Sequence, residues 1–217
     1  MKKEILMLLF FSFILITGAK AQKKSLLLAV TMNDTSETKS LIESGADLEE
    51  RINIGASQGM TPLYFAVRFG MTDVAKILIN AGADVNVKAS DSSSALLASV
   101  GNNHTECVKL LLDAGADSNV KDSRYGITPL MIAVMKGNVE IINLLLKAGA
   151  NINETRDNGM SPLMYAVREN QIESVKILLK KGADKNLKNN RGQTALMMAK
   201  EKEYQNIIDL FEESKIK

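Results

Sequence analysis

Residues 128–153 read TPLMIAVMKGNVEIINLLLKAGANIN, and this stretch specifies the fold of the chain. Thr128 is a candidate helix N-cap, because its hydroxyl can accept a hydrogen bond from a backbone N–H that lacks a partner within the helix. Pro129 follows at the first helical position, where its missing N–H costs nothing. Gly137 is suited to end this helix. The apolar spacing that follows predicts a second helix, which ends near Gly149.

Two short antiparallel helices form one layer with an unburied side, so the unit needs copies of itself as neighbours. Copies begin near Lys24, Thr61, Ser94, Thr128, Ser161 and Thr194. The glycine that ends the second helix recurs in register, each time followed by alanine, at Gly45, Gly82, Gly115, Gly149 and Gly182. Residues 22–217 are therefore predicted to form a single array of repeats.

The openings of three copies resemble the T-P-L-H-x-A opening of ankyrin repeats. They are Thr61-Pro62-Leu63, Thr128-Pro129-Leu130 and Ser161-Pro162-Leu163, which hold all three prolines of the chain. The resemblance implies an all-α ankyrin-repeat solenoid of about six helix-turn-helix repeats with β-hairpin-like connecting loops. It also implies a partner protein bound on the concave helix face and the loop tips.

The chain departs from this family pattern at the histidine of the opening. Its place is taken by Tyr64, Leu97, Met131, Met164 and Met197. Methionine is flexible and apolar, so we expect adaptable packing there in place of the polar contacts of a histidine. The last copy has a polar second helix, as a terminal repeat needs for solubility.

Residues 1–21 have the pattern of a secretory signal peptide. Lys2 and Lys3 precede the apolar run 5–16, and Ala19-Lys20-Ala21 is a small-x-small cleavage site. The alternative is an uncleaved membrane anchor, but a spanning helix needs about 20 apolar residues. We expect export to the periplasm or the extracellular space, with no membrane span after cleavage.

The charge balance gives no reason to expect a nucleic-acid partner. Residues 1–21 hold three of the 27 basic residues and one of the 25 acidic residues, so the remainder carries 24 of each. A neutral chain with interspersed signs has no electrostatic footprint for nucleic acid. We therefore expect another protein as the partner of a monomeric chain.

Catalytic and metal-binding chemistry lack the necessary residues. His104 is the only histidine and Cys107 the only cysteine, so neither a catalytic triad nor a closed metal site is expected. Cys107 falls on an apolar helix face and is expected to be a buried small residue. The Glu49-Glu50 pair is expected to be solvated charge in a loop. The chain is predicted to be non-catalytic and to need no cofactor.

If the family geometry applies, partner-binding residues lie at the ends of the first helices and at the loop tips. The candidates are Arg68, Phe69, Asn102, Arg124, Tyr125, Met135, Lys136, Arg168 and Glu169. Interface cores are enriched in aromatic residues, methionine and arginine. Phe69 stands out among these residues, because a turn position has no evident structural need for a large ring.

Two functions are open at this point. The first is a non-catalytic protein-binding scaffold of the periplasm or extracellular space. The second is a secreted effector or toxin-associated factor that acts on a host or competitor protein. Location discriminates between them, since the second requires release into the medium.

Further candidates for partner binding lie in the loops. They are Gln58, Ser90 and Asp91, and the insertion around Ile52 and Ile54.

Overall fold

The computed structural model describes residues 25–51, 59–89 and 93–213. The expected signal peptide, Lys24, the loop candidates Gln58, Ser90 and Asp91, and the insertion residues Ile52 and Ile54 lie outside the described residues. Within the described part, each repeat has a first and a second helix. The first helices are α2 (Leu26–Thr31), α4 (Pro62–Arg68), α6 (Ala95–Gly101), α8 (Pro129–Lys136), α10 (Pro162–Arg168) and α12 (Ala195–Glu201). The second helices are α3 (Thr35–Glu43), α5 (Thr72–Asn80), α7 (Thr105–Asp113), α9 (Val139–Lys147), α11 (Ile172–Lys180) and α13 (Gln205–Glu213).

The start of each first helix from α4 onwards is fixed by a side-chain cap. The hydroxyl of Thr128 accepts a hydrogen bond from the backbone N–H of Met131 at 3.3 Å, and Pro129 occupies the first turn. The predicted cap is therefore confirmed. Four more hydroxyl residues cap in the same way: Thr61, Ser94, Ser161 and Thr194. The hydroxyl satisfies a backbone donor that the helix itself leaves unpaired.

The turns between first and second helices use left-handed backbone angles. Gly137 ends α8 with a φ of 67°, as the sequence predicts. Asn103 takes the same place after α6 with a φ of 64°. Asparagine tolerates this conformation better than most residues, so the replacement leaves the turn intact.

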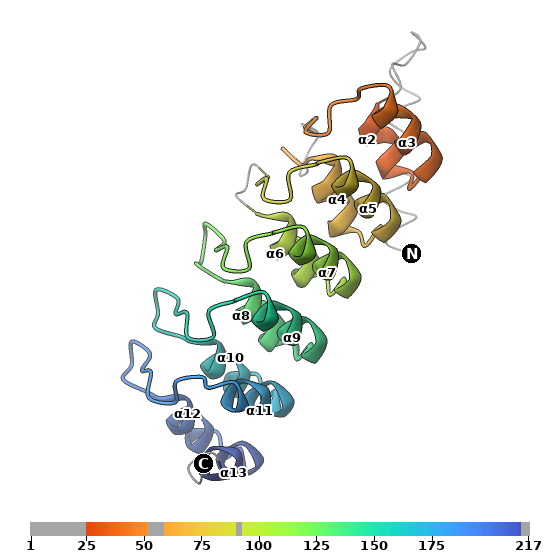
Figure 1. Cartoon of the computed structure of the whole chain (residues 1–217). Coiled ribbons are helices and arrows are strands. Elements are labelled where there is room, and N and C mark those ends of the chain that lie inside the picture. Colours follow the sequence, from red (N-terminus) through yellow and green to blue (C-terminus); the bar gives the residue numbers. More distant parts are fainter. Residues whose placement is uncertain (1–24, 52–58, 90–92, 214–217) are drawn as a thin grey trace.

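The helices stack as two layers in chain order (Figure 1). Each first helix contacts the first helices of its neighbours, and the second helices do the same. The connecting loops project from the side of the first helices. One continuous apolar core runs between the layers, with Val74, Cys107 and Ile141 fully buried at equivalent positions of the second helices. Each internal repeat thus buries both of its sides against copies of itself.

The residues that replace the family histidine pack in this core in the internal repeats. Tyr64, Leu97, Met131 and Met164 are buried, which confirms the expected apolar packing. Met197 is 53% exposed because α12 belongs to the last repeat and has no following first helix in the described residues to cover it. The second helix of that repeat buries only Ile207 and Phe211.

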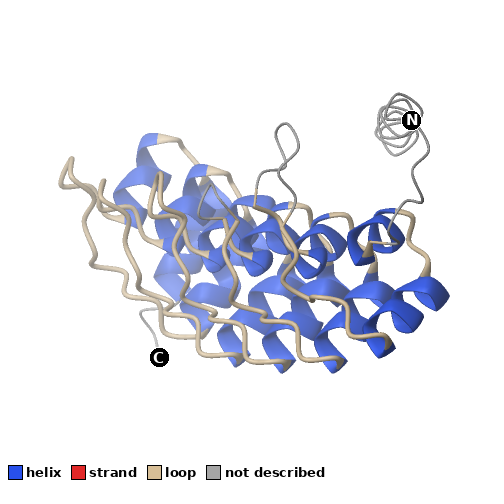
Figure 2. Cartoon of the chain, turned by 90° about the horizontal axis from the view of Figure 1, so that it is seen from above, coloured by secondary structure: helices blue, strands red, loops and turns tan. Residues whose placement is uncertain are grey.

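The connecting loops are held by side chains, with little backbone pairing. Figure 2 shows helices and loops but no strand in the described residues. Hairpin pairing in the described loops consists of an isolated bridge between Lys88 and Ser94 and of single backbone hydrogen bonds, such as the one from Asn189 to Gln193. Glu49 accepts a hydrogen bond from the backbone N–H of Asp84 at 2.9 Å. The expectation that Glu49 is solvated loop charge is therefore wrong, because the carboxylate joins the first described repeat to the next.

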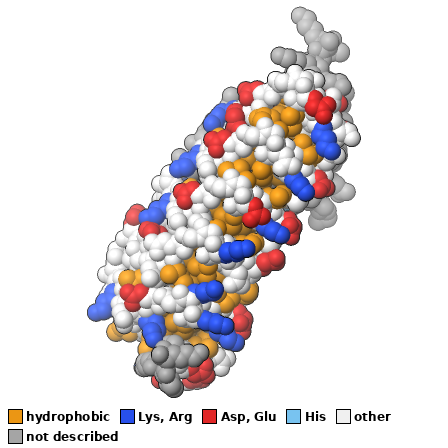
Figure 3. Space-filling view, in the orientation of Figure 1, with side chains coloured by type: hydrophobic (Ala, Val, Ile, Leu, Met, Phe, Trp, Pro, Cys, Tyr) orange, Lys and Arg blue, Asp and Glu red, His pale blue; other side chains and the backbone are white. Residues whose placement is uncertain are grey.

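The face shown in Figure 3 has a line of apolar side chains along the array, flanked by charged side chains of both signs. Basic and acidic side chains alternate along it, so this face carries no continuous patch of one sign. No helix within the described ranges is long and apolar enough to span a bilayer.

Candidate partner-binding site

The candidate residues lie in two places, the C-terminal ends of the first helices and one loop. Arg68, Met135, Lys136 and Arg168 belong to the last turns of α4, α8 and α10. Phe69, Asn102 and Glu169 are the residues that end α4, α6 and α10. Arg124 and Tyr125 lie in the loop between α7 and α8. The structure brings some of these residues together and leaves others apart.

Phe69 has a structural role that the sequence did not reveal. Its ring lies 4.5 Å from the ring of Phe65, centroid to centroid, and packs against the core. The expectation that this turn has no structural need for a large ring is therefore wrong. Arg68 lies 3.4 Å from the hydroxyl of Tyr64, which donates to Ser93 of the next repeat. Asn102 donates to the carbonyl of Ala98 at the end of its own helix.

Five candidates are linked by contacts across three repeats: two lie in the loop between α7 and α8, and three lie at the ends of α8 and α10. Arg156 lies in the loop that precedes α10. Its Nε donates to the backbone carbonyl of Tyr125 at 2.6 Å, and its guanidinium lies 5.5 Å from the centre of the Tyr125 ring. Arg124 lies 5.9 Å from the same ring. Tyr125 is 50% exposed, so two cations frame an aromatic ring that still faces solvent.

Arg156 also connects the loop of Tyr125 to α10, the first helix of the fifth repeat. Its Nη1 donates to the hydroxyl of Tyr165 at 2.8 Å. The Tyr165 side chain is buried, so this hydrogen bond satisfies a polar group that would otherwise be costly to bury. The guanidinium of Arg168 lies 4.6 Å from the centre of the Tyr165 ring, within cation–π distance.

The remaining contact of this group is an ion pair between the adjacent residues Arg168 and Glu169. Arg168 donates to one carboxylate oxygen of Glu169 from Nε at 2.8 Å and from Nη2 at 2.7 Å. The same Nη2 lies 3.9 Å from the sulfur of Met135 in the preceding repeat. We call the group the Arg–Tyr cluster; it consists of Arg124, Tyr125, Met135, Arg156, Tyr165, Arg168 and Glu169.

The loop that carries Tyr125 is fixed by its own side chains. Asp122 Oδ1 accepts hydrogen bonds from the backbone N–H groups of Tyr125 at 3.1 Å and Ile127 at 2.7 Å. An aspartate that bonds the backbone in this way builds a turn. Because the turn and Arg156 both hold the loop, the Tyr125 ring is presented on a defined backbone.

Sequence reasoning missed Arg156 and Tyr165. Tyr165 occupies the core position that Phe65 and Ile132 fill in other repeats, so a helical pattern assigns it to the core alone. Arg156 stands where the other loops have Ala89, Asp122 or Asn189. The one signal in the sequence was that a guanidinium replaces alanine, aspartate or asparagine at the loop position, and a phenol replaces an apolar residue in the helix that follows.

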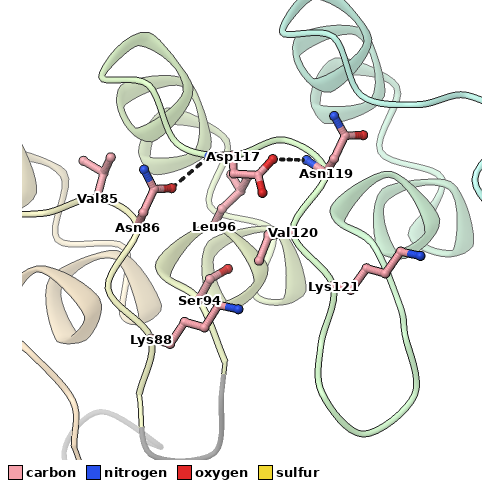
Figure 4. A pocket seen from close by; sticks show the side chains of 9 residues that line it. All are labelled: Val85, Asn86, Lys88, Ser94, Leu96, Asp117, Asn119, Val120 and Lys121. Carbon is pink, nitrogen blue, oxygen red and sulfur yellow. Dashed lines mark hydrogen bonds between the residues drawn. The ribbon is translucent and has the colours of Figure 1, made fainter.

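The loops of the second and third repeats also form an open pocket, with a volume of about 380 Å³ (Figure 4). Val85, Leu96 and Val120 line it, and Lys88 and Lys121 lie at its rim. Lys121 forms an ion pair with Glu154 at 2.6 Å. This pair lowers the pKa of Glu154, chiefly through the hydrogen bond from Lys121. The described residues contain no group of three side chains suited to hold a metal ion.

Comparison with known proteins agrees with this architecture. The family model described as ankyrin repeats (3 copies) matches residues 5–89, 87–156 and 148–217. The chain belongs to the ankyrin-repeat family. Ankyrin repeats generally mediate protein–protein interaction and are typically non-catalytic scaffolds.

Two solved ankyrin-repeat structures are similar to the chain over most of its length. A crystal structure of an ankyrin repeat domain from Acinetobacter baumannii AYE is 30% identical, with a TM-score of 0.80. The similarity covers 88% of this chain and 97% of that domain. The ankyrin repeat protein EF0377 is 31% identical, with a TM-score of 0.78 and coverage of 86% and 96%.

Proposed function

We propose that this ankyrin-repeat chain is a non-catalytic scaffold that binds a partner protein after export, in the periplasm or the extracellular space. The partner docks on the ends of the first helices and the loop tips, with the Arg–Tyr cluster as the centre of the interface. Export is supported by the signal-peptide pattern of residues 1–21.

One observation carries the binding proposal. Tyr125 is a half-exposed ring on a fixed loop, with guanidinium groups at 5.5 and 5.9 Å. Tyrosine and arginine are the residues most enriched among the side chains that dominate binding energy. A rigid aromatic residue loses little conformational freedom on binding, so it suits the role of an anchor.

The test is affinity capture with the mature chain, residues 22–217, from the envelope and culture-medium fractions of the native cell. A partner bound through the proposed surface should be retained by the unmodified chain and lost by the Tyr125→Ala variant. The matched control is Ile172→Ala, since Ile172 is also an exposed apolar residue but lies at the start of α11. Capture that survives Tyr125→Ala would refute this interface.

Export is tested separately from binding. Fractionation of cells that express residues 1–217 should place a processed chain beginning at Gln22 outside the cytoplasm. The same chain without residues 1–21 should stay inside. A full-length product that remains in the cytoplasm would contradict the proposed location, whereas the binding surface would be unaffected.

A further inference from the structure

The Arg168–Glu169 pair has the form of an occupied carboxylate site. Two guanidinium donors converge on one oxygen of the Glu169 carboxylate, at 2.8 and 2.7 Å. Donation by two N–H groups of one guanidinium is common where arginine binds carboxylates, and here both groups share one oxygen. Both side chains are exposed, at 41% and 39% of their full areas, so the pair is accessible to another molecule. Exposed ion pairs contribute little stability, which makes Glu169 easy to displace.

The guanidinium of Arg168 also has contacts that do not involve Glu169. It lies 4.6 Å from the centre of the Tyr165 ring and 3.9 Å from the Met135 sulfur. Tyr165 is buried, and its hydroxyl is held by Arg156 at 2.8 Å. These contacts would keep the donors in place after Glu169 moves away. The site is thus organised before a second carboxylate arrives, and such preorganisation favours binding.

The charge around this site is suited to an acidic segment. Arg124 and Lys136 are exposed. Neither of them forms an ion pair in the described part of the chain. Arg156 adds a third cation between them and Arg168. The acidic side chains at the cluster are Glu169, already used by Arg168, Asp157, which lies beside Gly126, and Asp122, whose Oδ1 accepts from backbone N–H groups of the Tyr125 loop. The cationic side chains here outnumber the acidic ones, and they lie beside an exposed aromatic ring. This arrangement favours a partner that carries carboxylates.

We propose that the Arg–Tyr cluster binds an acidic peptide segment of the partner, one carboxylate of which replaces Glu169 on the donors of Arg168. This inference rests on the proposed function and gives the chemistry of the partner. Glu169 then acts as an internal competitor. Removing its charge strengthens binding, whereas removing Arg168 weakens it.

The equivalent position of the second repeat provides an internal comparison. Arg68 aligns with Arg168, but Phe69 stands where Glu169 does, and Arg68 lies against the hydroxyl of Tyr64 at 3.4 Å. No carboxylate of this chain occupies its donors in the described residues. Arg68→Gln is therefore the matched control for Arg168→Gln.

The experiment measures binding of a short fluorescent peptide of alternating glutamate and tyrosine to residues 22–217, by fluorescence anisotropy at low salt. Glu169→Gln should tighten binding by about 2- to 5-fold, as expected for release of an exposed ion pair. Arg168→Gln should weaken it by about 10-fold. Arg68→Gln and Glu173→Gln, a change on the outer helix α11, should leave it unchanged. A peptide with glutamine in place of glutamate should bind weakly.

Three results would overturn the inference. They are unchanged or weaker binding by Glu169→Gln, equal binding of the glutamine peptide, and equal competition by a single-stranded DNA oligonucleotide, which would indicate general polyanion binding. Circular dichroism of each variant confirms that it is folded. If Tyr125-dependent capture of a protein succeeds while the acidic peptide fails to bind, the carboxylate inference fails and the proposed function stands. If both fail, the proposed function fails as well.

Discussion

Asn119 of the third repeat accepts a hydrogen bond from the backbone N–H of Asn151 in the fourth repeat, with 2.7 Å between the side-chain oxygen and the nitrogen. Its amide nitrogen donates to the carbonyl of Gly149 at 3.1 Å. Asn86 and Asn153 make the same contact to the next repeat, to Asp117 and Asp184. The second, third and fourth repeats are thus each joined to the next repeat by an asparagine that follows the second helix.

Asn119→Ala should destabilise the array by about 1 kcal/mol, because it removes two hydrogen bonds between repeats at a partly solvated edge. Asn186→Ala is the matched control. Asn186 has the same place in the last loop, but no side-chain hydrogen bond is found for it within the described residues. Denaturant unfolding of both variants tests this, and equal effects would show that the inter-repeat bonds contribute nothing.

Of the three consecutive leucines in α9, we expect only Leu145 to be strongly sensitive to substitution by alanine. Leu145 is fully buried, whereas Leu144 and Leu146 are partly buried. Leu145→Ala should lower the free energy of unfolding by about 2–5 kcal/mol, since it removes buried methyl groups and leaves a cavity. Leu144→Ala and Leu146→Ala should cost less. Urea unfolding monitored by circular dichroism measures all three, and a loss at Leu145 within error would contradict the stacking of repeats.

Two glycine-to-alanine substitutions should change the free energy of unfolding in opposite directions. Gly137 has a φ of 67°, and an added Cβ would overlap the side-chain amide of Gln171 in the next repeat. Gly137→Ala should therefore destabilise by about 1–2 kcal/mol. Gly101 is helical with no heavy atom within 4 Å of an added Cβ. Gly101→Ala should stabilise by about 0.4–1 kcal/mol, because alanine restricts the unfolded chain.

Thermal melts compare the two glycine variants directly. The double variant Gly137→Ala with Gln171→Ala should recover part of the loss, since it removes the overlap; the backbone strain remains, and the hydrogen bond from Gln171 Nε2 to the Met135 carbonyl is lost as well. If Gly137→Ala proved as stable as the unmodified chain, the left-handed turn would be less restrictive than its geometry indicates.

The fold could be predicted from sequence because its determinants are local. Thr128 caps the backbone N–H three residues later in the chain, and Gly137 ends the helix directly before it. Each acts within one or two turns of chain, so its role can be inferred without knowing the rest of the structure. Repetition then supplies the long-range contacts, since every repeat packs on a copy of itself.

The Arg–Tyr cluster could be predicted only in part, because it depends on how side chains of different repeats are placed. Arg156 contacts Tyr125, which lies 31 residues earlier in the chain. It contacts Tyr165 only at the hydroxyl of that tyrosine. Whether Tyr165 turns its hydroxyl to the core or to the loop is decided by the neighbouring repeat. Position within a repeat identified Tyr125 and Arg168, but could not identify the residue that connects them.

Cys107 should be inert to thiol reagents while the chain is folded. The side chain is fully buried, and burial raises the pKa of the thiol despite a weak contact with Thr72 at 3.8 Å. The thiolate is the reactive form, so both effects slow modification. Because the folded-state pKa is raised, the contribution of this thiol to stability is full below the ordinary thiol pKa. It falls as pH rises above that value, since the unfolded thiol ionises first.

The measurement is the rate of reaction with an aromatic disulfide reagent at mildly alkaline pH, over a series of urea concentrations. The rate should be very low in native buffer and should follow the unfolding transition seen by circular dichroism. Leu145→Ala should raise the logarithm of the rate in native buffer in proportion to its loss of stability, because the buried thiol is reached through opening of the repeats. Rapid and complete labelling of the folded chain would show that the second-helix core is open at α7.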